Sequence, residues 1–249
     1  MEDIPRLPTA WRPRSTEGLE RLQSSTPARI GVWRAGTRPT TGQMLKFRCD
    51  HASAVDAVYS EVSEELLLEL GLFTVETQYG NKEIYLKRPD RGRKLTDEAI
   101  DTITKKCKLN PQVQIVVSDG LSGSAIEANL TDCYLSLLDS LAVHGLEAGT
   151  PFFVKGGRVA CMDQIGELLQ AEVLVLFIGE RPGLVSSSSM SAYMCYRPRF
   201  GTVESDRMVI SNIHPQGTFP AEAGAYIGDL LHTILQHKAS GVKLDSMRK

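Results

Sequence analysis

Apolar residues in the first half of the chain recur at helical spacing. Between positions 50 and 70 most of them lie three or four residues apart: Ala54, Val55, Val58, Val62, Leu66, Leu67 and Leu70. This period predicts a helix of about five turns, and Gly71 follows it as a C-terminal stop. Thr96 is placed to cap a second, shorter helix that ends near Cys107, because acidic residues follow it in the first turn.

The second half of the chain alternates between short apolar runs and longer amphipathic segments. Strands are predicted over 113–117, 151–160, 173–178 and 208–213, and helices over 124–143, 163–169 and 220–237. Two of the strands lack alternation, as expected for strands covered on both faces. The repetition of strand, loop and helix predicts an α/β fold, with an open, mostly parallel, Rossmann-like sheet flanked by helices.

These patterns divide the chain into three segments. Residues 1–40, rich in Pro, Arg, Ser and Thr, are typical of an extended N-terminal arm. Residues 41–110 are predicted to form a helical N-terminal region, and residues 111–249 an α/β domain. Ligands of such sheets bind beyond the carboxyl ends of the strands. The loops that leave predicted strands are therefore candidate site loops: Ser118–Gly123, Gly179–Ser189 and Asn212–Phe219.

Composition and charge narrow the functional classes. The 249 residues include 28 Lys and Arg against 30 Asp and Glu, a net charge of −2. This balance argues against a nucleic-acid partner, since phosphate contacts need an excess of basic residues. No apolar run approaches the roughly 20 residues that span a bilayer, and the first residues lack the apolar core of a secretory signal. We therefore expect a soluble intracellular protein that does not bind membranes.

The cysteines give no sign of a metal centre. Five of them are scattered singly along the chain: Cys49, Cys107, Cys133, Cys161 and Cys195. A zinc site or a disulfide framework needs closer or paired spacing. We expect reduced and partly buried thiols, and no metal site.

Two of the candidate loops carry recognisable but incomplete motifs. SDGLSG, at 118–123, matches neither glycine-rich phosphate loop nor the GxSxG nucleophile elbow. It is either a tight strand-to-helix turn shaped by Asp119 and Gly120, or a helix N-terminus that places a polar ligand group. GERPG, at 179–183, puts Glu180 and Arg181 directly after the most apolar strand. These two form an exposed ion pair, or Glu180 accepts hydrogen bonds from a ligand, and we favour the ligand.

Several longer segments are more specific than these motifs. They are TPARIGVWRAGTRPTT (26–41), DHASAVDAVYSEV (50–62), GNKEIYLKRPDRGR (80–93), VVSDGLS (116–122), GGRVACMDQIGELLQAEVLVLFIGERPG (156–183) and ISNIHPQGT (210–218). In this order they resemble the small subunit of ethanolamine ammonia-lyase. The resemblance covers nearly the whole chain and leaves out about the first 25 residues.

The resemblance implies a subunit of an adenosylcobalamin-dependent carbon–nitrogen lyase, which converts ethanolamine to acetaldehyde and ammonia by a radical mechanism. It implies a hetero-oligomer in which a larger, barrel-shaped subunit binds ethanolamine and supplies most catalytic groups. The small subunit, through its α/β domain at 111–249, closes over the corrinoid and provides no catalytic residue. The implied location is the bacterial cytoplasm or an ethanolamine-utilisation microcompartment.

Carried over residue by residue, the family's cobalamin contacts fall on Val159, Glu180 and Val209. The family often has cysteine at the third position, so Val209 offers only packing or its backbone. His214 lies in a sequence one residue away from the DxHxxG pattern by which some cobalamin domains supply a cobalt ligand, with Asn212 in place of the aspartate. The family keeps the cofactor's own benzimidazole on cobalt, which favours a plain loop histidine.

Two other classes of function stay open. One is a self-sufficient α/β hydrolase or transferase that uses Glu180 and Arg181. The other is an interaction protein whose N-terminal arm docks to a bacterial shell. The first 25 residues fit that docking role and simple disorder equally well.

Overall fold

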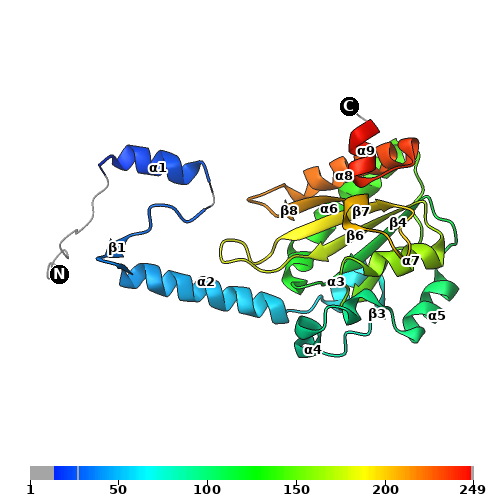
Figure 1. Ribbon diagram of the computed structural model, residues 1–249, viewed down its shortest axis with the longest axis horizontal. Helices are drawn as coiled ribbons and strands as arrows, with labels where there is room; N and C mark the ends of the chain where they lie inside the picture. The colour runs from blue at the N-terminus through cyan, green and yellow to red at the C-terminus, as the bar shows by residue number, and fades with distance from the viewer. Residues whose placement is uncertain (1–13, 27, 248–249) are drawn as a thin grey trace.

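A six-stranded sheet forms the centre of the computed structural model, which describes residues 14–26 and 28–247 (Figure 1). The sheet order is β3-β5-β4-β6-β7-β8, in which the first four strands are parallel and β7 and β8 are antiparallel to their neighbours. The bounds are Phe73–Glu76 (β3), Val113–Ser118 (β4), Phe152–Lys155 (β5), Val173–Gly179 (β6), Met190–Tyr196 (β7) and Arg207–Ile213 (β8). The predicted α/β class, with a mostly parallel sheet, is confirmed.

Helices cover both faces of this sheet. On one face lie α6 (Gly123–Val143) and α8 (Pro220–His237), together with the short α3 (Glu64–Glu69) and α9 (Gly241–Met247). On the other lie α5 (Asp97–Lys106) and α7 (Cys161–Leu169). Alternate residues of β6 enter the two cores, with Phe177 on the α6 side and Ile178 on the α7 side. The prediction of strands buried on both faces is therefore confirmed for β4 and β6.

The long helix predicted up to Leu70 is interrupted. The chain instead forms α2 (Thr41–Tyr59) and α3 (Glu64–Glu69), separated by residues 60–63. Ser60 donates to the carbonyl of Ala57 at 2.7 Å, and the Ser63 hydroxyl accepts from the backbone N–H of Leu66 at 3.3 Å. These local hydrogen bonds compete with helix continuation. The prediction was wrong about one continuous helix but right about its end, since Gly71 has a φ of 67°.

Other elements follow the sequence more closely. The Thr96 hydroxyl accepts from the backbone N–H of Ala99 at 3.1 Å and caps α5, as predicted. The strand predicted over 151–160 is shorter, because it stops at Lys155 and Gly156 turns the chain with a φ of 70°. Several elements were not predicted: α1 (Thr16–Ser24), β1 (Arg34–Ala35), β2 (Arg38–Pro39), β3, α4 (Lys82–Lys87), η1 (Arg91–Arg93), β7, η2 (Glu204–Asp206) and α9 (Gly241–Met247).

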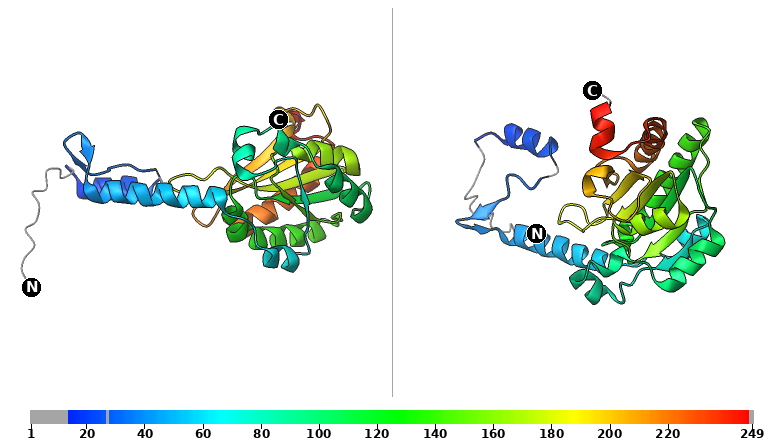
Figure 2. Two further views of the ribbon diagram at one scale, coloured as in Figure 1. Left: turned by 90° about the horizontal axis from the view of Figure 1, so that it is seen from below. Right: turned by 45° about the vertical axis from the view of Figure 1, so that its right-hand side comes forward.

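An N-terminal arm extends from the α/β body (Figure 2). The helix α2 leaves the body and carries the β1–β2 hairpin and α1 near its far end. The arm is therefore partly regular within its described residues, rather than extended throughout. The region predicted as helical also supplies β3, which pairs with β5 at the edge of the sheet. The division of the chain at residues 40 and 110 stays a prediction.

Two further features concern the chemistry that the fold allows. All five cysteines are free thiols, with Cys49 exposed and the other four buried. Within residues 14–26 and 28–247, no helix is both long and apolar enough to cross a bilayer, and no group of three His, Cys, Asp or Glu side chains is arranged to hold a metal ion.

Candidate functional site

The predicted site loops lie at one edge of the sheet. Because β7 runs antiparallel between β6 and β8, the last strand ends at the same edge as β6. The backbone N–H of Leu121 donates to the carbonyl of Gly179 at 3.0 Å, which joins the first loop to the second. The N–H of Asn212 donates to the Glu180 carboxylate at 3.2 Å, which joins the second to the third. The three candidate loops therefore lie together at the carboxyl ends of β4, β6 and β8.

A pocket of about 470 Å³ opens where these loops meet the sheet. Its wall contains Val159, Glu180 and Val209, the three residues selected through the resemblance. They come from the loop before α7, the end of β6 and the middle of β8. Residues 50 positions apart in the sequence therefore share one concave surface, of the kind that binds small molecules.

Glu180 is held in place by three hydrogen bonds. The hydroxyl of Ser189 donates to its Oε2 at 2.8 Å, the hydroxyl of Ser191 donates to its Oε1, and the N–H of Asn212 donates to Oε1 at 3.2 Å. A carboxylate has about four acceptor positions, so roughly one stays available. The half-buried Glu180 is thus a preoriented acceptor at the pocket wall.

The two valines form apolar parts of the wall. Val159 is half-buried and packs at the margin of the core beneath α7. Val209 pairs in register with Tyr193 of β7, and 47% of its surface is exposed. Helices α5 and α7 cover the sheet face over β3 to β6. The Tyr193–Val209 pair lies on the same face, at the margin of the region that these helices cover, and the face is accessible to solvent there.

Several residues of the pocket were not predicted from the sequence, among them Arg158, Ser191 and Tyr193. Tyr193 and Ser191 come from β7, a strand that had not been predicted. Burial raises the pKa of Tyr193, and the neighbouring Glu180 carboxylate raises it further. Arg158 lies directly before Val159 in GGRV, within a segment that carries the resemblance. Its place beside Val159, a residue carried over from the family, could have pointed to Arg158.

Arg158 is fixed against an aromatic ring. Its guanidinium lies 4.1 Å from the centroid of the Tyr85 ring, and its Nη2 donates to the Tyr85 carbonyl at 3.3 Å. The Tyr85 hydroxyl donates to the carbonyl of Gly157 at 2.7 Å, which anchors the ring beneath the loop. Among the described residues, no partner reaches the buried Nε of Arg158.

The SDGLSG loop serves mainly as a turn. Asp119 accepts from the N–H of Gly156 at 2.8 Å and links this loop to the end of β5. Burial raises the pKa of the Asp119 carboxyl, although the nearby Lys82 ammonium favours its charged form. Gly120 has a φ of 52°, in the left-handed region that favours glycine. The structure shows the strand-to-helix turn and also places Gly120 and Leu121 in the pocket wall, so a ligand contact of this loop stays a prediction.

The serines of the same loop are also used structurally. Ser118 Oγ accepts from the N–H of Gly157 at 3.1 Å, and Ser122 caps α6 by accepting from Ala125 at 3.2 Å. Glu180 and Arg181 form no ion pair within the described part of the chain, and Arg181 is exposed. Both residues line the pocket, and the hydrolase or transferase alternative stays a hypothesis.

His214 has both ring nitrogens engaged inside its own loop. Nδ1 accepts from the backbone N–H of Gln216 at 3.2 Å, so the proton lies on Nε2, which donates to Oδ1 of Asn212 at 2.8 Å. The side chain is buried and does not line the pocket. This arrangement agrees with a loop histidine and leaves neither nitrogen directed at a metal.

Comparisons with known proteins give a family. The sequence model of the ethanolamine ammonia-lyase light chain (EutC) matches residues 16–245. The chain is similar to the ethanolamine ammonia-lyase small subunits of Listeria innocua and Clostridioides difficile, each 48% identical over 97% of this chain and 83% of the relative. It is 46% identical to that of Fusobacterium nucleatum, over 98% of this chain and 82% of the relative. The chain therefore belongs to the ethanolamine ammonia-lyase small-subunit family.

Proposed function

We propose that this chain completes the adenosylcobalamin site of an ethanolamine ammonia-lyase, together with a large subunit. The observation that carries the proposal is the pocket between the loop before α7, the end of β6 and the middle of β8, where Val159, Glu180 and Val209 lie together. Glu180 is the proposed hydrogen-bond acceptor for the cofactor, and the valines are its apolar contacts. The word "small" in the names of the relatives supports a larger partner.

The chemistry of the pocket fits the edge of a corrinoid. That edge carries carboxamides, whose N–H groups a fixed carboxylate can accept from, and methyl groups, which suit valine. Pockets for drug-sized ligands measure about 300–1,000 Å³, and a corrinoid with its nucleotide loop is larger than such ligands. A pocket of about 470 Å³ therefore holds only part of it. A second subunit that covers the rest is consistent with this size.

The role proposed for this chain is to orient the cofactor and keep water away from it. Adenosylcobalamin, when bound, supplies the radical chemistry of the reaction. Glu180, preoriented by Ser189, Ser191 and Asn212, fixes one edge of the cofactor at little entropic cost. We assign no general acid or base to this chain, and we propose that ethanolamine binds mainly to the large subunit. The proposed location is the bacterial cytoplasm or a microcompartment within it.

The test is reconstitution with a purified large subunit. We expect weak binding of adenosylcobalamin to this chain alone and tight binding to the complex, with cobalamin-dependent release of acetaldehyde. Glu180→Ala should weaken cofactor binding by the complex by about 1–3 kcal/mol, since a hydrogen bond to a charged group is lost. Glu147→Ala is the matched control, because it removes an exposed glutamate from the loop before β5, at the opposite ends of the strands from the pocket.

Two results would contradict the proposal. Tight, stoichiometric binding of adenosylcobalamin by this chain alone would show that the cofactor site is not shared between two subunits. An unchanged affinity of the Glu180→Ala complex, together with an unchanged Glu147→Ala complex, would remove Glu180 from the cofactor site. Loss of affinity in both variants to the same degree would show that the effect of Glu180→Ala is not specific to the pocket.

A further inference from the structure

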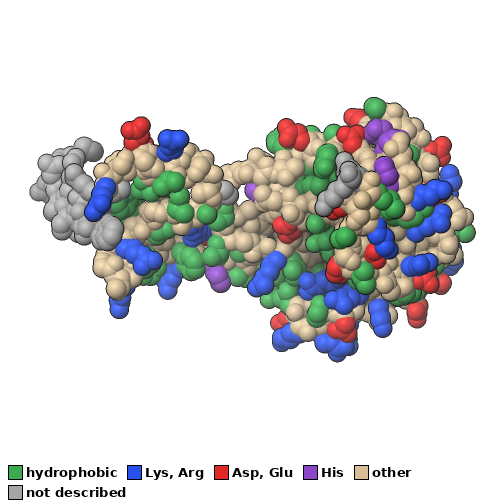
Figure 3. Space-filling view, turned by 45° about the horizontal axis from the view of Figure 1, so that its top comes forward, with side chains coloured by type: hydrophobic (Ala, Val, Ile, Leu, Met, Phe, Trp, Pro, Cys, Tyr) green, Lys and Arg blue, Asp and Glu red, His purple; other side chains and the backbone are tan. Residues whose placement is uncertain are grey.

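A second pocket lies at the edge of the sheet opposite the proposed cofactor site. Its volume is about 500 Å³, and its wall includes the loop after β7 and the turn between α8 and α9. Because Tyr196, the last residue of β7, pairs with Val173 at the start of β6, this loop lies at the edge away from Gly179. Figure 3 shows Lys and Arg side chains at this end of the α/β body, away from the arm. We call this second pocket the basic pocket.

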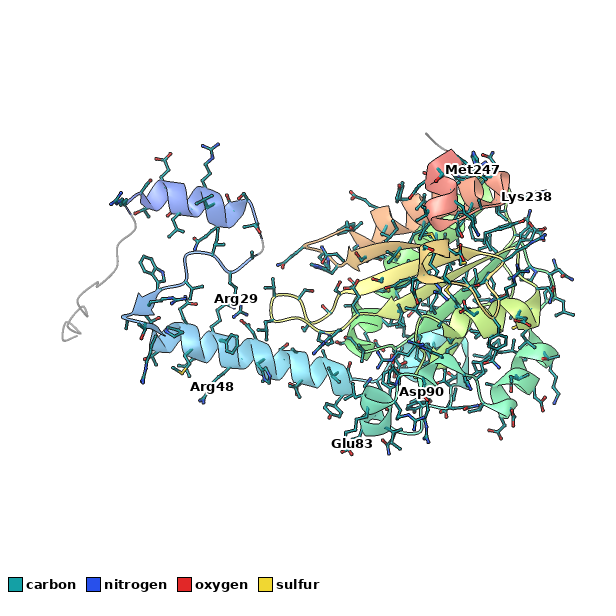
Figure 4. All side chains as sticks on the ribbon, in the orientation of Figure 1. Arg29, Arg48, Glu83, Asp90, Lys238 and Met247 are labelled. Carbon is teal, nitrogen blue, oxygen red and sulfur yellow. The ribbon has the colours of Figure 1, made fainter. Side chains whose placement is uncertain are left out.

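The basic pocket concentrates positive charge. Four cations and one acidic residue line it: Arg197, Arg199, Lys238, Lys243 and Asp206. Asp206 is already paired, since the Lys243 ammonium lies 3.1 Å from its Oδ1, and this hydrogen bond lowers the pKa of the Asp206 carboxyl. Within residues 14–26 and 28–247, the other three cations form no ion pair. Figure 4 shows Lys238 at the end of the body that is far from the arm.

Two glutamates beside the same loop do not neutralise the arginines. Glu167 and Glu172 share an adjoining hollow with Arg197 and Arg199. The Glu167 carboxylate accepts from the backbone N–H of Phe200 at 3.0 Å. In the described part of the chain, neither glutamate forms an ion pair with either guanidinium. The cations therefore repel one another across the basic pocket, and a bound anion would relieve this repulsion.

Two of the cations stand on strained backbone. Arg197 has a φ of 45° and Lys238 a φ of 51°, both in the left-handed region that is unfavourable for side chains with a Cβ. Lys238 follows the last turn of α8, at a position that glycine usually fills. Glycine at either position would remove the strain, yet both carry a cation that lines the same pocket. Backbone strain of this kind is concentrated at sites that bind ligands.

The segments around the basic pocket are tied together. The buried hydroxyl of Ser240 accepts from the backbone N–H of Tyr196 at 2.9 Å and donates to the carbonyl of Asp206. It thereby joins the turn between α8 and α9 to the end of β7 and to η2. The Thr202 hydroxyl accepts from the N–H of Arg199 at 3.0 Å, which closes the loop after β7. The cations are therefore presented from a fixed frame, as a binding site requires.

We propose that the basic pocket binds a small ligand with a phosphate or diphosphate group and a flat apolar part, of the class of a nucleoside diphosphate. The guanidinium forks of Arg197 and Arg199 match the oxygens of a phosphate, and Lys238 adds charge. The Phe200 ring, 62% exposed in the pocket wall, offers a face for stacking. The pocket volume of about 500 Å³ suits such a ligand, since pockets for drug-sized molecules measure about 300–1,000 Å³. This site goes beyond the proposed function, because the two pockets share no residue.

The test is calorimetric titration of the full chain with ADP, diphosphate and adenosine, in the absence of divalent cations. We expect ADP and diphosphate to bind with a Kd below about 1 mM, and adenosine to bind at least about tenfold more weakly than ADP. Arg197→Gly and Lys238→Gly should each weaken the binding of both ADP and diphosphate at least about fivefold, because a charged hydrogen bond is lost. Phe200→Ala should weaken ADP about three- to tenfold and leave diphosphate unchanged, because it removes the stacking face.

Gln170→Gly and Lys105→Ala are the matched controls. Gln170 also has a positive φ, of 55°, but lies outside the basic pocket, so glycine there relieves strain without removing a cation. Lys105 is an exposed cation on α5, outside the basic pocket. Both controls should bind ADP within about twofold of wild type. Urea denaturation checks that each variant is folded, and Phe200→Ala, a change of an exposed side chain, keeps the test decisive if a glycine variant does not fold.

Several results would overturn the inference. One is a wild-type chain that binds neither ADP nor diphosphate with a Kd below about 1 mM. Another is equal weakening by Lys105→Ala and Lys238→Gly, which would show a general attraction of anions to cations on the surface. Weakening by Arg181→Ala would place the ligand in the pocket around Glu180 instead. Adenosine that binds as tightly as ADP would remove the role of the phosphates, and ADP binding that Phe200→Ala leaves unchanged would overturn the nucleotide class.

Discussion

Nε2 of His214 donates a hydrogen bond to Oδ1 of Asn212 at 2.8 Å. Asn212 has a φ of 60°, in the left-handed region, and its backbone N–H donates to the Glu180 carboxylate at 3.2 Å. The imidazole therefore holds the residue that orients the proposed cofactor acceptor. The histidine that resembled a cobalt ligand in the sequence is, in the structure, a positioning residue two hydrogen bonds away from the pocket.

His214→Gln and His214→Asn should differ in their effect on cofactor binding. The glutamine amide can reach the position of Nε2 and keep the bond to Asn212, whereas the asparagine amide reaches only the position of Nδ1. We expect the Gln variant of the complex to bind adenosylcobalamin within about twofold of wild type, and the Asn variant about three- to tenfold more weakly, as for one lost hydrogen bond. Equal affinities of the two variants would show that the bond to Asn212 does not position Glu180.

Gly120 should tolerate alanine much less well than Gly145. Both have positive φ, 52° and 66°, so alanine costs each about 1–2 kcal/mol of strain. A Cβ at Gly120 would also lie 2.5 Å from the carbonyl oxygen of Gly179, while one at Gly145 would meet nothing within 4 Å. Urea denaturation should show Gly120→Ala to be less stable than Gly145→Ala by about 1–3 kcal/mol. Similar losses would mean that the two loops can move apart.

The sequence allowed the α/β class and the site loops to be predicted, but not the order of the sheet. The buried runs of β4 and β6 and the cap at Thr96 are local signals, and they were found. The strand β7, with sequence MSAYMCY, mixes two tyrosines, which favour strands, with small and flexible residues, and it lacks a regular alternation of apolar and polar positions. It is a strand because β6 and β8 pair with it on both sides. Such long-range pairing cannot be predicted from the sequence of the strand alone.

The break between α2 and α3 has the same kind of cause. The helical period continues across residues 60–63, but Ser60 Oγ accepts from the N–H of Ser124 at 2.7 Å, at the start of α6. This contact joins residues far apart in the sequence. For the site, the strand-end rule pointed to Glu180, whereas Val159 and Val209 came only from the resemblance. Ser191 and Tyr193 were missed together with β7.

In the native chain, Cys49 alone should react with thiol reagents near pH 8. Burial raises the pKa of Cys107 and Cys195 to about 11, and that of Cys133 and Cys161 to about 12. Their reactive thiolate forms are therefore scarce at pH 8, and their burial blocks access. Mass spectrometry after brief labelling should find one modified cysteine, and five after denaturation. Rapid labelling of a second cysteine in the folded protein would contradict this burial.

The same thiols predict a loss of stability in alkali. In the unfolded chain they ionise near their ordinary pKa of 9.0, while in the folded chain they stay neutral up to about pH 11–12. The unfolded state therefore loses protons first, and the free energy of unfolding should fall as the pH rises from about 9 to about 12. Cys133→Ala should flatten this fall slightly when the midpoint of urea denaturation is followed against pH. A curve identical to that of the wild type would assign the fall to other groups, such as the buried tyrosines.

Val209 offers a way to test the pocket without disturbing the fold. Its side chain is 47% exposed on an edge strand, so Val209→Asp should change the free energy of unfolding by less than about 1 kcal/mol. In the complex, however, the carboxylate would face the apolar part of the bound cofactor without a partner, and adenosylcobalamin should bind at least about tenfold more weakly.

Val242→Asp is the control, since Val242 is 60% exposed on α9, away from the pocket. Val209→Cys, which restores the residue frequent in the family, should keep the affinity within about threefold of wild type, because a thiol packs much like a small apolar side chain. If Val209→Asp binds the cofactor as tightly as Val242→Asp does, the cofactor does not reach β8, and the proposed site shrinks to the loops around Glu180.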